Sequence, residues 1–487
     1  MPVARNAQVG PLIEGVPVTT APRIRYSPTD LLTLVVLRPA WAYRVELLLA
    51  VLAAAAWVGL AHLSTRTIAG AVLLVGAAAL VAIPATRRLL VRLLYRARFR
   101  RRWTLACRHA DLATLNDRIP VIRSITDIPA GERLHVRVPA GSQVPELEHA
   151  AEPIAAFLEA MDVRVARDPG NARYAHVTVV RRDPLAAPLA DPWPWLRAGR
   201  LDLWAAGIPV GLDEHGELVC LNLAEKNVLL GGEPGSGKSV GASMLLAAAA
   251  LDPRVRLILC DGALVELAPW RRVADHFVGP DPDAFLDVLS DLRDELARRL
   301  DELLAAGRRK AAPGDGLSLI VVVIDELAFY LNTGNRKLDE QISAALRDLV
   351  ARGRKTGIIV IAATQRPSHD VVPTSIRDLF AYRWAFRCTT PEASDTILGR
   401  GHASLGYSAA DIDAAHRGVG WLRAEGTEPR RLRTFYLTDV HLTELAEHAA
   451  TQRELAGRPA GRLRADLHRL DHLVQDEDPD ATTEGAA

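Results

Sequence analysis

The chain has 487 residues, of which 24% are charged and 49% hydrophobic, and its formal net charge is +1. This length allows two or three domains, and the near-neutral balance by itself points to neither a nucleic acid nor a membrane partner. Four cysteines lie far apart and form no CxxC pair (Cys107, Cys220, Cys260 and Cys388). This spacing argues against a disulfide framework or a cysteine zinc site and favours a reducing compartment.

The N-terminal part changes composition sharply after residue 44. Residues 1–44 carry no clear periodicity and are expected to form an irregular cytosolic leader. Residues 45–85 contain two apolar runs, LLLAVLAAAAWVGLAHL and IAGAVLLVGAAALVAI, joined by STRT. Because about 17 to 20 apolar residues cross the hydrocarbon core of a bilayer, we predict a transmembrane helical hairpin. A signal peptide or a buried soluble hairpin are the alternatives, disfavoured by the late start and the scarcity of polar positions.

Residues 86–118 form a basic segment next to this hairpin. Eight arginines and no acidic residue occur between positions 87 and 102. Since Lys and Arg favour the cytoplasmic side, we expect a plasma-membrane protein whose termini and main domain are cytoplasmic, with the lipid bilayer as a partner. Contact of these arginines with DNA is the alternative, although binding to anionic lipid explains them fully.

Two smaller regions flank the main domain. Residues 119–183 are predicted as a small α/β module, because RLHVRVPAG and YAHVTVVRR alternate in polarity and PELEHAAEPIAAFLEAM has helical spacing. Residues 184–207 are rich in Pro and Trp and are interpreted as a linker. Residues 442–487 are expected to form a helix followed by an acidic disordered tail.

The strongest motif is GGEPGSGKS at residues 231–239, which fits the GxxxxGK[ST] pattern of a P-loop. The apolar run VLL precedes it and VGASMLLAAAAL follows it, as expected for a strand and a helix. Lys238 is predicted to contact the β- and γ-phosphates of ATP, and the Ser239 hydroxyl to bind Mg²⁺. The predicted nucleotide-binding residues are Gly232, Glu233, Pro234, Gly235, Ser236, Gly237, Lys238, Ser239 and Val240.

A second acidic element follows in LIVVVIDE at residues 319–326. The continuous β-branched run is typical of a buried parallel strand. Asp325 falls at its carboxyl end, where open α/β sheets bind ligands, and is predicted to orient Mg²⁺ directly or through water. Glu326 is predicted to act as the general base that polarises the attacking water.

Two further apolar runs end in polar residues that are expected at the same edge. RLILCD ends at Asp261, and IIVIAATQ ends at Thr364 and Gln365. Gln365 could sense the γ-phosphate, or it could make a structural hydrogen bond. Helical segments at 284–306 and 339–352 alternate with these strands, so we predict an α/β fold with a mostly parallel, doubly wound sheet over residues 208–441.

The segment from Asp325 through RDLVARGRKTGI to IVIAATQRPSHDVVPTSIRDLFAYRWAFRC resembles the FtsK/SpoIIIE motor family, as does CDGALVELAPW. The resemblance covers about residues 208–437. It implies a membrane-anchored, RecA-like ATPase that forms a hexameric ring, uses ATP and Mg²⁺, and translocates double-stranded DNA. Lys238 and Ser239 then match the nucleotide positions, Asp325 and Glu326 the magnesium and hydrolysis positions, and Gln365 the sensor.

Ring ATPases of this kind complete each site with an arginine from a neighbouring subunit. Arg299 in DELARRL and Arg383 in AYRWAF match family positions and are the candidates for this catalytic role. Each can equally be an ordinary surface or structural arginine.

The chain also departs from the family pattern. Ala263 replaces the lysine of the family's D-x-K-x-x-E-L segment, and little chain follows Leu437 to form a winged-helix reader of DNA. As a shorter chain with two expected membrane spans, this protein resembles the double-stranded DNA transfer proteins of conjugative plasmids and integrative elements of high-GC bacteria. We therefore expect a DNA translocase of conjugative transfer or of chromosome or plasmid movement. A type-VII-like protein-secretion ATPase and a non-hydrolysing membrane scaffold are the alternatives.

Overall fold

The computed structural model describes residues 43–63, 66–189, 192–365 and 372–458. Nearly all of the predicted leader, the acidic tail and the RPS letters of the ATQRPS stretch lie outside these residues. The chain divides into two compact units. The first holds the chain up to residue 125 together with 135–159 and 165–176, and the second holds the remainder.

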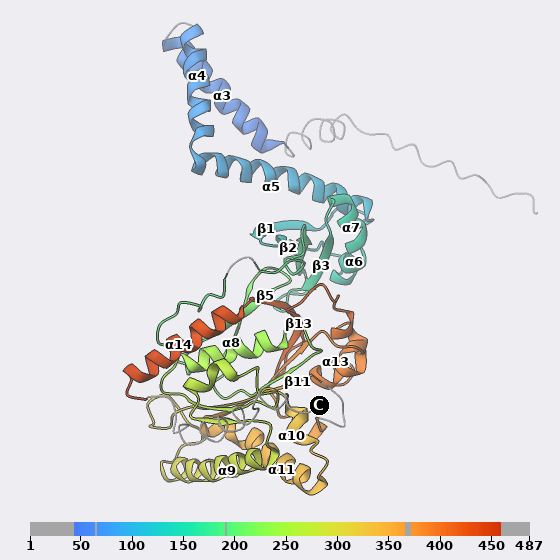
Figure 1. Cartoon of the computed structure of the whole chain (residues 1–487). Coiled ribbons are helices and arrows are strands. Elements are labelled where there is room, and N and C mark those ends of the chain that lie inside the picture. The colour runs from blue at the N-terminus through green and yellow to red at the C-terminus, as the bar shows by residue number, and fades with distance from the viewer. Residues whose placement is uncertain (1–42, 64–65, 190–191, 366–371, 459–487) are drawn as a thin grey trace, which may run out of the picture. The chain divides into compact units, whose positions relative to one another are not determined.

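Two helices form where the transmembrane hairpin was predicted. They are α3 (Arg44–Leu63) and α4 (Arg66–Ala82), which pack against each other (Figure 1). Helix α3 carries Glu46 in its first turn and His62 in its last, and α4 has 17 residues. Among the described residues, we find no helix that is both long and apolar enough to cross a membrane. The structure therefore does not support the predicted membrane-crossing hairpin.

The basic segment continues as one long helix, α5 (Pro84–His109). Pro84 stands in its first turn, where the missing N–H has no intrahelical partner to lose. The C-terminal half of α5 buries one face, including Phe99 and Trp103, and packs against α7. The indole Nε1 of Trp103 donates a hydrogen bond to the carbonyl oxygen of Pro120 at 2.9 Å. The arginine-rich segment thus contributes to a packed unit and is not merely an extended flank.

A four-stranded sheet follows, with the order β1-β2-β4-β3. Its strands are β1 (Val121–Ile128), β2 (Gly131–Arg137), β3 (Asp162–Arg167) and β4 (Tyr174–Val180). The segment predicted as one helix forms two, α6 (Val144–His149) and α7 (Ala151–Leu158). The break falls at Ala150, three residues before Pro153, whose nitrogen carries no hydrogen and cannot donate the backbone bond to His149 that would continue α6.

The second unit is built on a ten-stranded sheet with the order β6-β5-β14-β13-β12-β7-β11-β10-β8-β9. The strands from β12 to β9 in this order run parallel, which confirms the predicted mostly parallel sheet. Four antiparallel strands extend it beyond β12 and were not predicted. The strands are β5 (Ile208–Asp213), β6 (Leu218–Leu221), β7 (Val228–Gly231), β8 (Arg256–Cys260), β9 (His276–Val278), β10 (Ile320–Ile324), β11 (Ile358–Thr364), β12 (Tyr382–Phe386), β13 (Val419–Ala424) and β14 (Arg430–Thr434).

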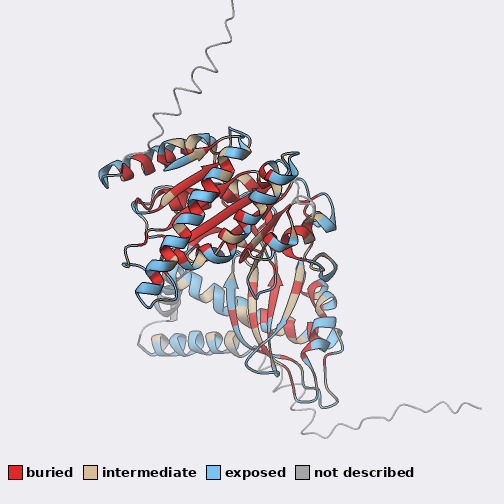
Figure 2. Cartoon of the chain, turned by 90° about the horizontal axis from the view of Figure 1, so that it is seen from below, coloured by how far each residue is buried: buried red, intermediate tan, exposed pale blue. Residues whose placement is uncertain are grey.

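Helices cover both faces of this sheet (Figure 1). Helices α8 (Lys238–Ala250) and α14 (Asp439–Leu455) pack on one face, and α9 (Pro282–Ala305) and α11 (Arg336–Arg352) on the other. Successive side chains of each parallel strand enter alternate cores, so the central strands are buried throughout, as Figure 2 shows in red. Shorter helices α10 (Leu327–Leu331), α12 (Thr374–Arg377) and α13 (Pro391–Leu398) connect these elements.

The strand order determines where the chemistry can take place. Strand β7, which leads into the P-loop, lies between β12 and β11, and β10 lies on the far side of β11. In this register Gly231 of β7 is the partner of Thr364, and Ile324 of β10 is the partner of Ala362. The carboxyl ends of β7, β11 and β10 therefore meet at one edge.

Candidate nucleotide-binding site

The P-loop runs from the end of β7 into the first turn of α8 and depends on glycine backbone conformations. Gly235 has φ +74° and Gly237, which precedes the first residue of α8, has φ +110°. A Cβ atom at Gly237 would lie 2.6 Å from the Cα atom of Gly418, which is closer than real contacts allow. The loop therefore presents the amino end of α8, whose free N–H groups and dipole favour an anion such as phosphate.

Two residues that are distant in sequence, Arg387 and Gly418, bond to this loop. The N–H of Gly418 donates to the carbonyl oxygen of Ser236 at 2.8 Å, and the N–H of Glu233 donates to the carbonyl oxygen of Arg387 at 2.9 Å. The guanidinium of Arg387 also pairs with the Glu233 carboxylate at 3.0 Å. Arg387 follows β12 and Gly418 precedes β13. The sequence carried no signal for either contact, because both depend on how these strands pair in the sheet.

Lys238 and Asp325 form a buried pair at this edge. The Nζ atom of Lys238 lies 3.8 Å from Oδ1 of Asp325 and donates a hydrogen bond to its backbone carbonyl oxygen at 3.3 Å. Burial, which the charge of Lys238 opposes, raises the pKa of the Asp325 carboxyl to about 6. The nearby carboxylates of Glu266, Asp261 and Glu326 act in the same direction as burial. The P-loop lysine and the acidic strand are thus brought together as the sequence predicts.

The neighbouring carboxylate, Glu326, is positioned by the strand between the P-loop and the acidic strand. Its Oε1 atom accepts hydrogen bonds from Thr364 Oγ1 at 2.9 Å and from the N–H of Ala328 at 3.2 Å. Its Oε2 atom accepts from the N–H of Gln365 at 2.8 Å. These bonds fix the carboxylate at the carboxyl edge of the sheet, the place expected of a general base. The positioning role of Thr364 was not foreseen.

Two of the residues predicted at this edge, Asp261 and Gln365, make hydrogen bonds within the protein. The carboxylate of Asp261 accepts hydrogen bonds from the N–H groups of Ala263 and Leu267, at 3.2 and 2.9 Å, and so holds the turn after β8. Ala263 therefore contributes its backbone to this turn. Gln365 contacts Glu326 through its backbone N–H. The sensor role of the Gln365 side chain stays a prediction.

The residues fit a magnesium-bound nucleoside triphosphate. Oδ2 of Asp325 and Oγ of Ser236 are buried without a hydrogen-bond partner in the described part of the chain. A buried unpaired oxygen is costly, and a metal-bound water or a phosphate group would satisfy it. Ser239 stands in the first turn of α8, and hydroxyl and carboxylate oxygens are the ligands that Mg²⁺ prefers. When bound, Mg²⁺ would neutralise charge on the phosphates.

Arg299, one candidate for the trans-acting arginine, is buried within its own domain, where its side chain is 2% exposed. It donates to Glu295 Oε1 and to the carbonyl oxygens of Ser318 and Thr356, each at 2.8 Å. In this conformation its guanidinium ties α9 to the segments before β10 and β11. Arg299 thus has the geometry of a structural arginine.

The second candidate, Arg383, lies on β12. It pairs with Asp378 Oδ1 at 3.2 Å, and its side chain is 11% exposed. Burial lowers the pKa of this guanidinium below its usual range. Arg383 borders a small hollow of about 90 Å³ that Arg423 and Glu425 also line. The finger role of either arginine stays a prediction.

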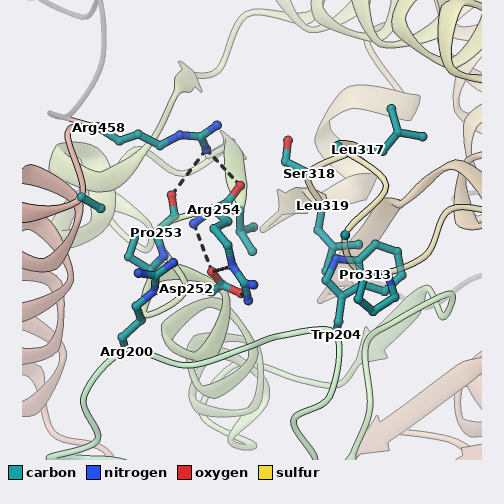
Figure 3. A pocket seen from close by; sticks show the side chains of 14 residues that line it. Arg200, Trp204, Asp252, Pro253, Arg254, Pro313, Leu317, Ser318, Leu319 and Arg458 are labelled. Atoms are coloured by element: carbon teal, nitrogen blue, oxygen red, sulfur yellow. Dashed lines mark hydrogen bonds and ion pairs between the residues drawn. The ribbon is translucent and has the colours of Figure 1, made fainter. Parts of the chain in front are cut away.

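A larger pocket, of about 470 Å³, lies elsewhere on the second unit (Figure 3). Its lining includes Arg254 and Val255, which precede β8, and Ser318 and Leu319, which precede β10. It therefore lies at the amino ends of these strands, whereas Lys238 and the acidic pair lie at the carboxyl ends. In α/β sheets of this type ligands bind at the carboxyl ends. The pocket is not the nucleotide site.

Comparison with known proteins agrees with this geometry. Residues 203–318 match the model of the FtsK/SpoIIIE family, a range that includes the P-loop and ends just before β10. The DNA translocase SftA of Bacillus subtilis (strain 168) is 27% identical over 360 residues, covering 70% of this chain and 36% of that protein. The DNA translocase FtsK of Chlorobaculum tepidum is 27% identical over 274 residues, covering 51% of this chain and 32% of that protein. The chain thus spans about a third of the length of these relatives.

The similarity to solved structures is weaker. The conjugation coupling protein TcpA of pCW3 has a TM-score of 0.45 and 18% identity, covering 72% of this chain and 98% of that one. The cytoplasmic domain of the Thermomonospora curvata type VII secretion ATPase EccC has a TM-score of 0.42 and 18% identity, covering 55% of this chain and 33% of that one. Both TM-scores are below 0.5, so neither likeness bears on the function of this chain. Residues 203–318 thus carry a domain that matches the FtsK/SpoIIIE family model, and the P-loop within them belongs to a site with the residues of an ATPase.

Proposed function

We propose that this protein is an ATP-driven translocase of double-stranded DNA. The observation that carries the proposal is the arrangement at the carboxyl edge of the sheet. A buried Lys238–Asp325 pair adjoins the P-loop, and Glu326 is held beside it by Thr364. A protein that only bound nucleotide would need the first feature but not a fixed general base. The cargo is inferred from the relatives, whose names describe DNA translocases.

The same arrangement suggests how hydrolysis could be coupled to movement. Glu326 is hydrogen-bonded to Thr364 and to the N–H of Gln365 at the end of β11. A change of nucleotide at the P-loop would alter the charge facing Glu326 and so change its hydrogen bonds to the carboxyl end of β11. We propose that such changes drive DNA-contacting loops against the phosphate backbone. Binding would then depend little on DNA sequence and strongly on salt concentration.

We further propose that six copies form a ring. An arginine from the neighbouring copy would complete each site and stabilise charge that develops on the γ-phosphate. Arg299 is committed to contacts inside its own domain. Arg383, which is less completely buried than Arg299, or an exposed arginine of the second unit, is therefore the better candidate for this role.

The cellular role and location are finer proposals. We propose transfer of double-stranded DNA between cells, as the sequence resemblance to transfer proteins implies, with chromosome or plasmid movement as the other role. Location at the plasma membrane, with the ATPase domain in the cytoplasm, rests on composition and not on a detected span. Leu48, Val51, Leu74 and Val75 of α3 and α4 are well exposed, and an arginine-rich helix follows them. Membrane fractionation of cells that express the chain tests the location.

The function is tested by ATP hydrolysis of the full-length chain with and without linear duplex DNA, with Glu326→Gln as the control. The proposal predicts a clear rise in turnover with duplex DNA that is absent in the control. Turnover that ignores duplex DNA but rises with a secreted peptide would instead favour protein secretion. Nucleotide binding without turnover under any condition would favour a scaffold. Either result contradicts the proposal.

A further inference from the structure

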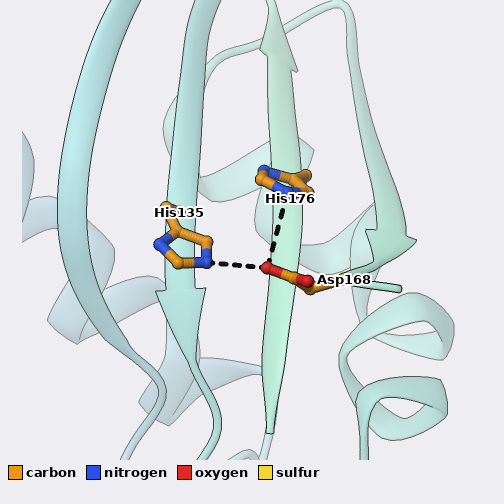
Figure 4. Close-up of side chains that lie close together, drawn as sticks. All are labelled: His135, Asp168 and His176. Carbon is orange, nitrogen blue, oxygen red and sulfur yellow. Dashed lines mark hydrogen bonds and ion pairs between the residues drawn. The ribbon is translucent and has the colours of Figure 1, made fainter. Parts of the chain in front are cut away.

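Three side chains outside the ATPase domain converge on one point of the four-stranded sheet (Figure 4). They are His135 on β2, His176 on β4 and Asp168, which directly follows β3. Because β2, β4 and β3 are neighbours in the sheet, the three residues form a row across it. From this convergence we propose that His135, His176 and Asp168 bind a divalent transition-metal ion of the zinc type.

The distances suit such an ion. The Nε2 atoms of His135 and His176 lie 3.1 and 3.7 Å from the same oxygen of Asp168, Oδ2. All three ligand atoms lie within 4.8 Å of one another. A zinc ion binds nitrogen and oxygen ligands at about 2.0–2.2 Å, so ligand atoms in a tetrahedral site are about 3.4 Å apart. Small side-chain rotations would therefore bring the three donors into one coordination sphere.

The surroundings orient the ligands. The N–H of Gly170 donates to Oδ1 of Asp168 at 2.8 Å, which leaves Oδ2 directed at the two imidazoles. The ring of His135 stacks on Tyr174 and on His176, with centroid distances of 4.8 and 5.1 Å. The hydrogen bond from Gly170 is of the kind that orients metal-binding carboxylates, because outer hydrogen-bond partners hold such ligands in place. The site thus has support beyond its three donors.

The donor set selects the ion. Two imidazole nitrogens and one carboxylate oxygen suit Zn²⁺, Co²⁺ or Ni²⁺, whereas Mg²⁺ and Ca²⁺ prefer oxygen alone. The site is therefore chemically distinct from the predicted magnesium position at Ser239 and Asp325. The three side chains are 22 to 45% exposed, so the ion can enter from solvent and water can fill the fourth position. The ion would join three strands and stabilise this sheet.

The test is titration of the full-length protein with Co²⁺, without nucleotide and in a Cys220→Ser background that removes the exposed thiol. We expect one equivalent to bind with a visible d–d spectrum, and Zn²⁺ to displace it and raise the Tm. His135→Ala and His176→Ala should each weaken binding about 100-fold or more, because even loss of an outer partner costs about 10- to 100-fold. Asp168→Asn should weaken binding while keeping the acceptor for Gly170.

The matched control is His149→Ala, because His149 is an exposed histidine of the same module whose ring contacts the carbonyl oxygen of Pro145. This change should leave Co²⁺ affinity unaltered. No stoichiometric binding by the parent protein would overturn the proposal. Equal binding by the parent and both histidine variants would overturn it as well, since the ion would then lie elsewhere. Circular dichroism of each variant confirms that the fold is retained.

Discussion

Nζ of Lys238 lies 3.8 Å from Oδ1 of Asp325, and the two side chains are 4% and 3% exposed. Each charge is removed from water and compensated mainly by the other. If the phosphates of a nucleotide paired with the Lys238 ammonium, Asp325 would lose its partner charge, and a metal ion would have to replace that charge. The pair links phosphate binding to magnesium binding before any chemistry takes place.

Removal of the lysine should destabilise the protein in a pH-dependent way. Lys238→Ala leaves the Asp325 carboxylate buried without its partner, which costs about 3–5 kcal/mol when the carboxylate is ionised. The native pKa of Asp325, about 6, lies above the ordinary value of 3.8. The contribution of the protonated Asp325 carboxyl to stability is therefore complete below about pH 4, and it is lost as the pH rises through the native pKa. The variant should be much less stable than the parent at pH 8, and the difference should shrink at pH 5.

Urea denaturation at both pH values measures this difference. Lys337→Ala is the control, because Lys337 is an exposed lysine of α11. It should change stability little at either pH. A Lys238→Ala penalty as large at pH 5 as at pH 8 would refute the coupling.

Thr364 should affect catalysis through Glu326. Thr364→Val keeps the shape of the side chain but removes the hydroxyl that donates to Oε1 of Glu326. We expect kcat to fall roughly 10-fold, because a general base contributes about 10²–10⁴-fold only when it is positioned. The KM for ATP should change little, since Thr364 makes no predicted phosphate contact. Steady-state kinetics separate the two parameters, and a raised KM with normal kcat would contradict the positioning role.

Two glycines of the P-loop should respond differently to the same substitution. Gly237→Ala combines a φ of +110° with a Cβ placed 2.6 Å from Gly418. Gly235→Ala has a φ of +74° and meets no atom within 4 Å. We expect Gly235→Ala to cost about 1 kcal/mol of stability and Gly237→Ala clearly more, with loss of nucleotide affinity. Thermal unfolding and binding of a fluorescent ATP analogue check this order. Equal effects of the two substitutions would show that the close approach of Gly418 does not determine which side chains the P-loop tolerates at position 237.

Arg299 should matter for stability more than for subunit cooperation. Arg299→Ala removes a buried guanidinium, so that the carbonyl oxygens of Ser318 and Thr356 lose this donor, while Glu295 keeps its hydrogen bonds from Arg298. The cost should be about 3 kcal/mol or more. The adjacent Arg298 is 51% exposed, and Arg298→Ala should cost less than about 1 kcal/mol. Denaturation of both variants provides the comparison. Arg299→Ala with parental stability but a large loss of ATPase activity would instead identify a trans-acting arginine.

The central part of the fold could be predicted because its signals are local. The β-branched run of β10 and the glycine pattern before α8 each lie within a few residues. A strand that is buried on both faces is an almost continuous run of apolar residues, so it can be recognised from its own sequence. The antiparallel strands β13, β14, β5 and β6 were missed for the opposite reason. Strand β14 pairs with β5, more than two hundred residues earlier, and these short strands carry no distinctive run.

The site shows the same division. Its motif residues, Lys238 and Asp325, were found in the sequence, and their spatial proximity followed from the expectation that parallel strands end at the same edge of the sheet. The contacts that hold the motif were not found. Arg387 and Gly418 reach the P-loop through the antiparallel pairing of β12 with β13, and Thr364 reaches Glu326 across neighbouring strands. Such contacts depend on register, which single-residue patterns do not encode.

Displacement of a triplex-forming strand from a linear duplex tests the central claim most directly, because it detects movement along DNA and not merely binding. The full-length protein should displace the third strand when ATP and Mg²⁺ are present, and both Lys238→Ala and Glu326→Gln should fail. The non-hydrolysable analogue of ATP should support duplex binding without displacement. ATP hydrolysis that proceeds normally on the same duplex while the third strand stays in place would contradict the account of this protein as a DNA translocase.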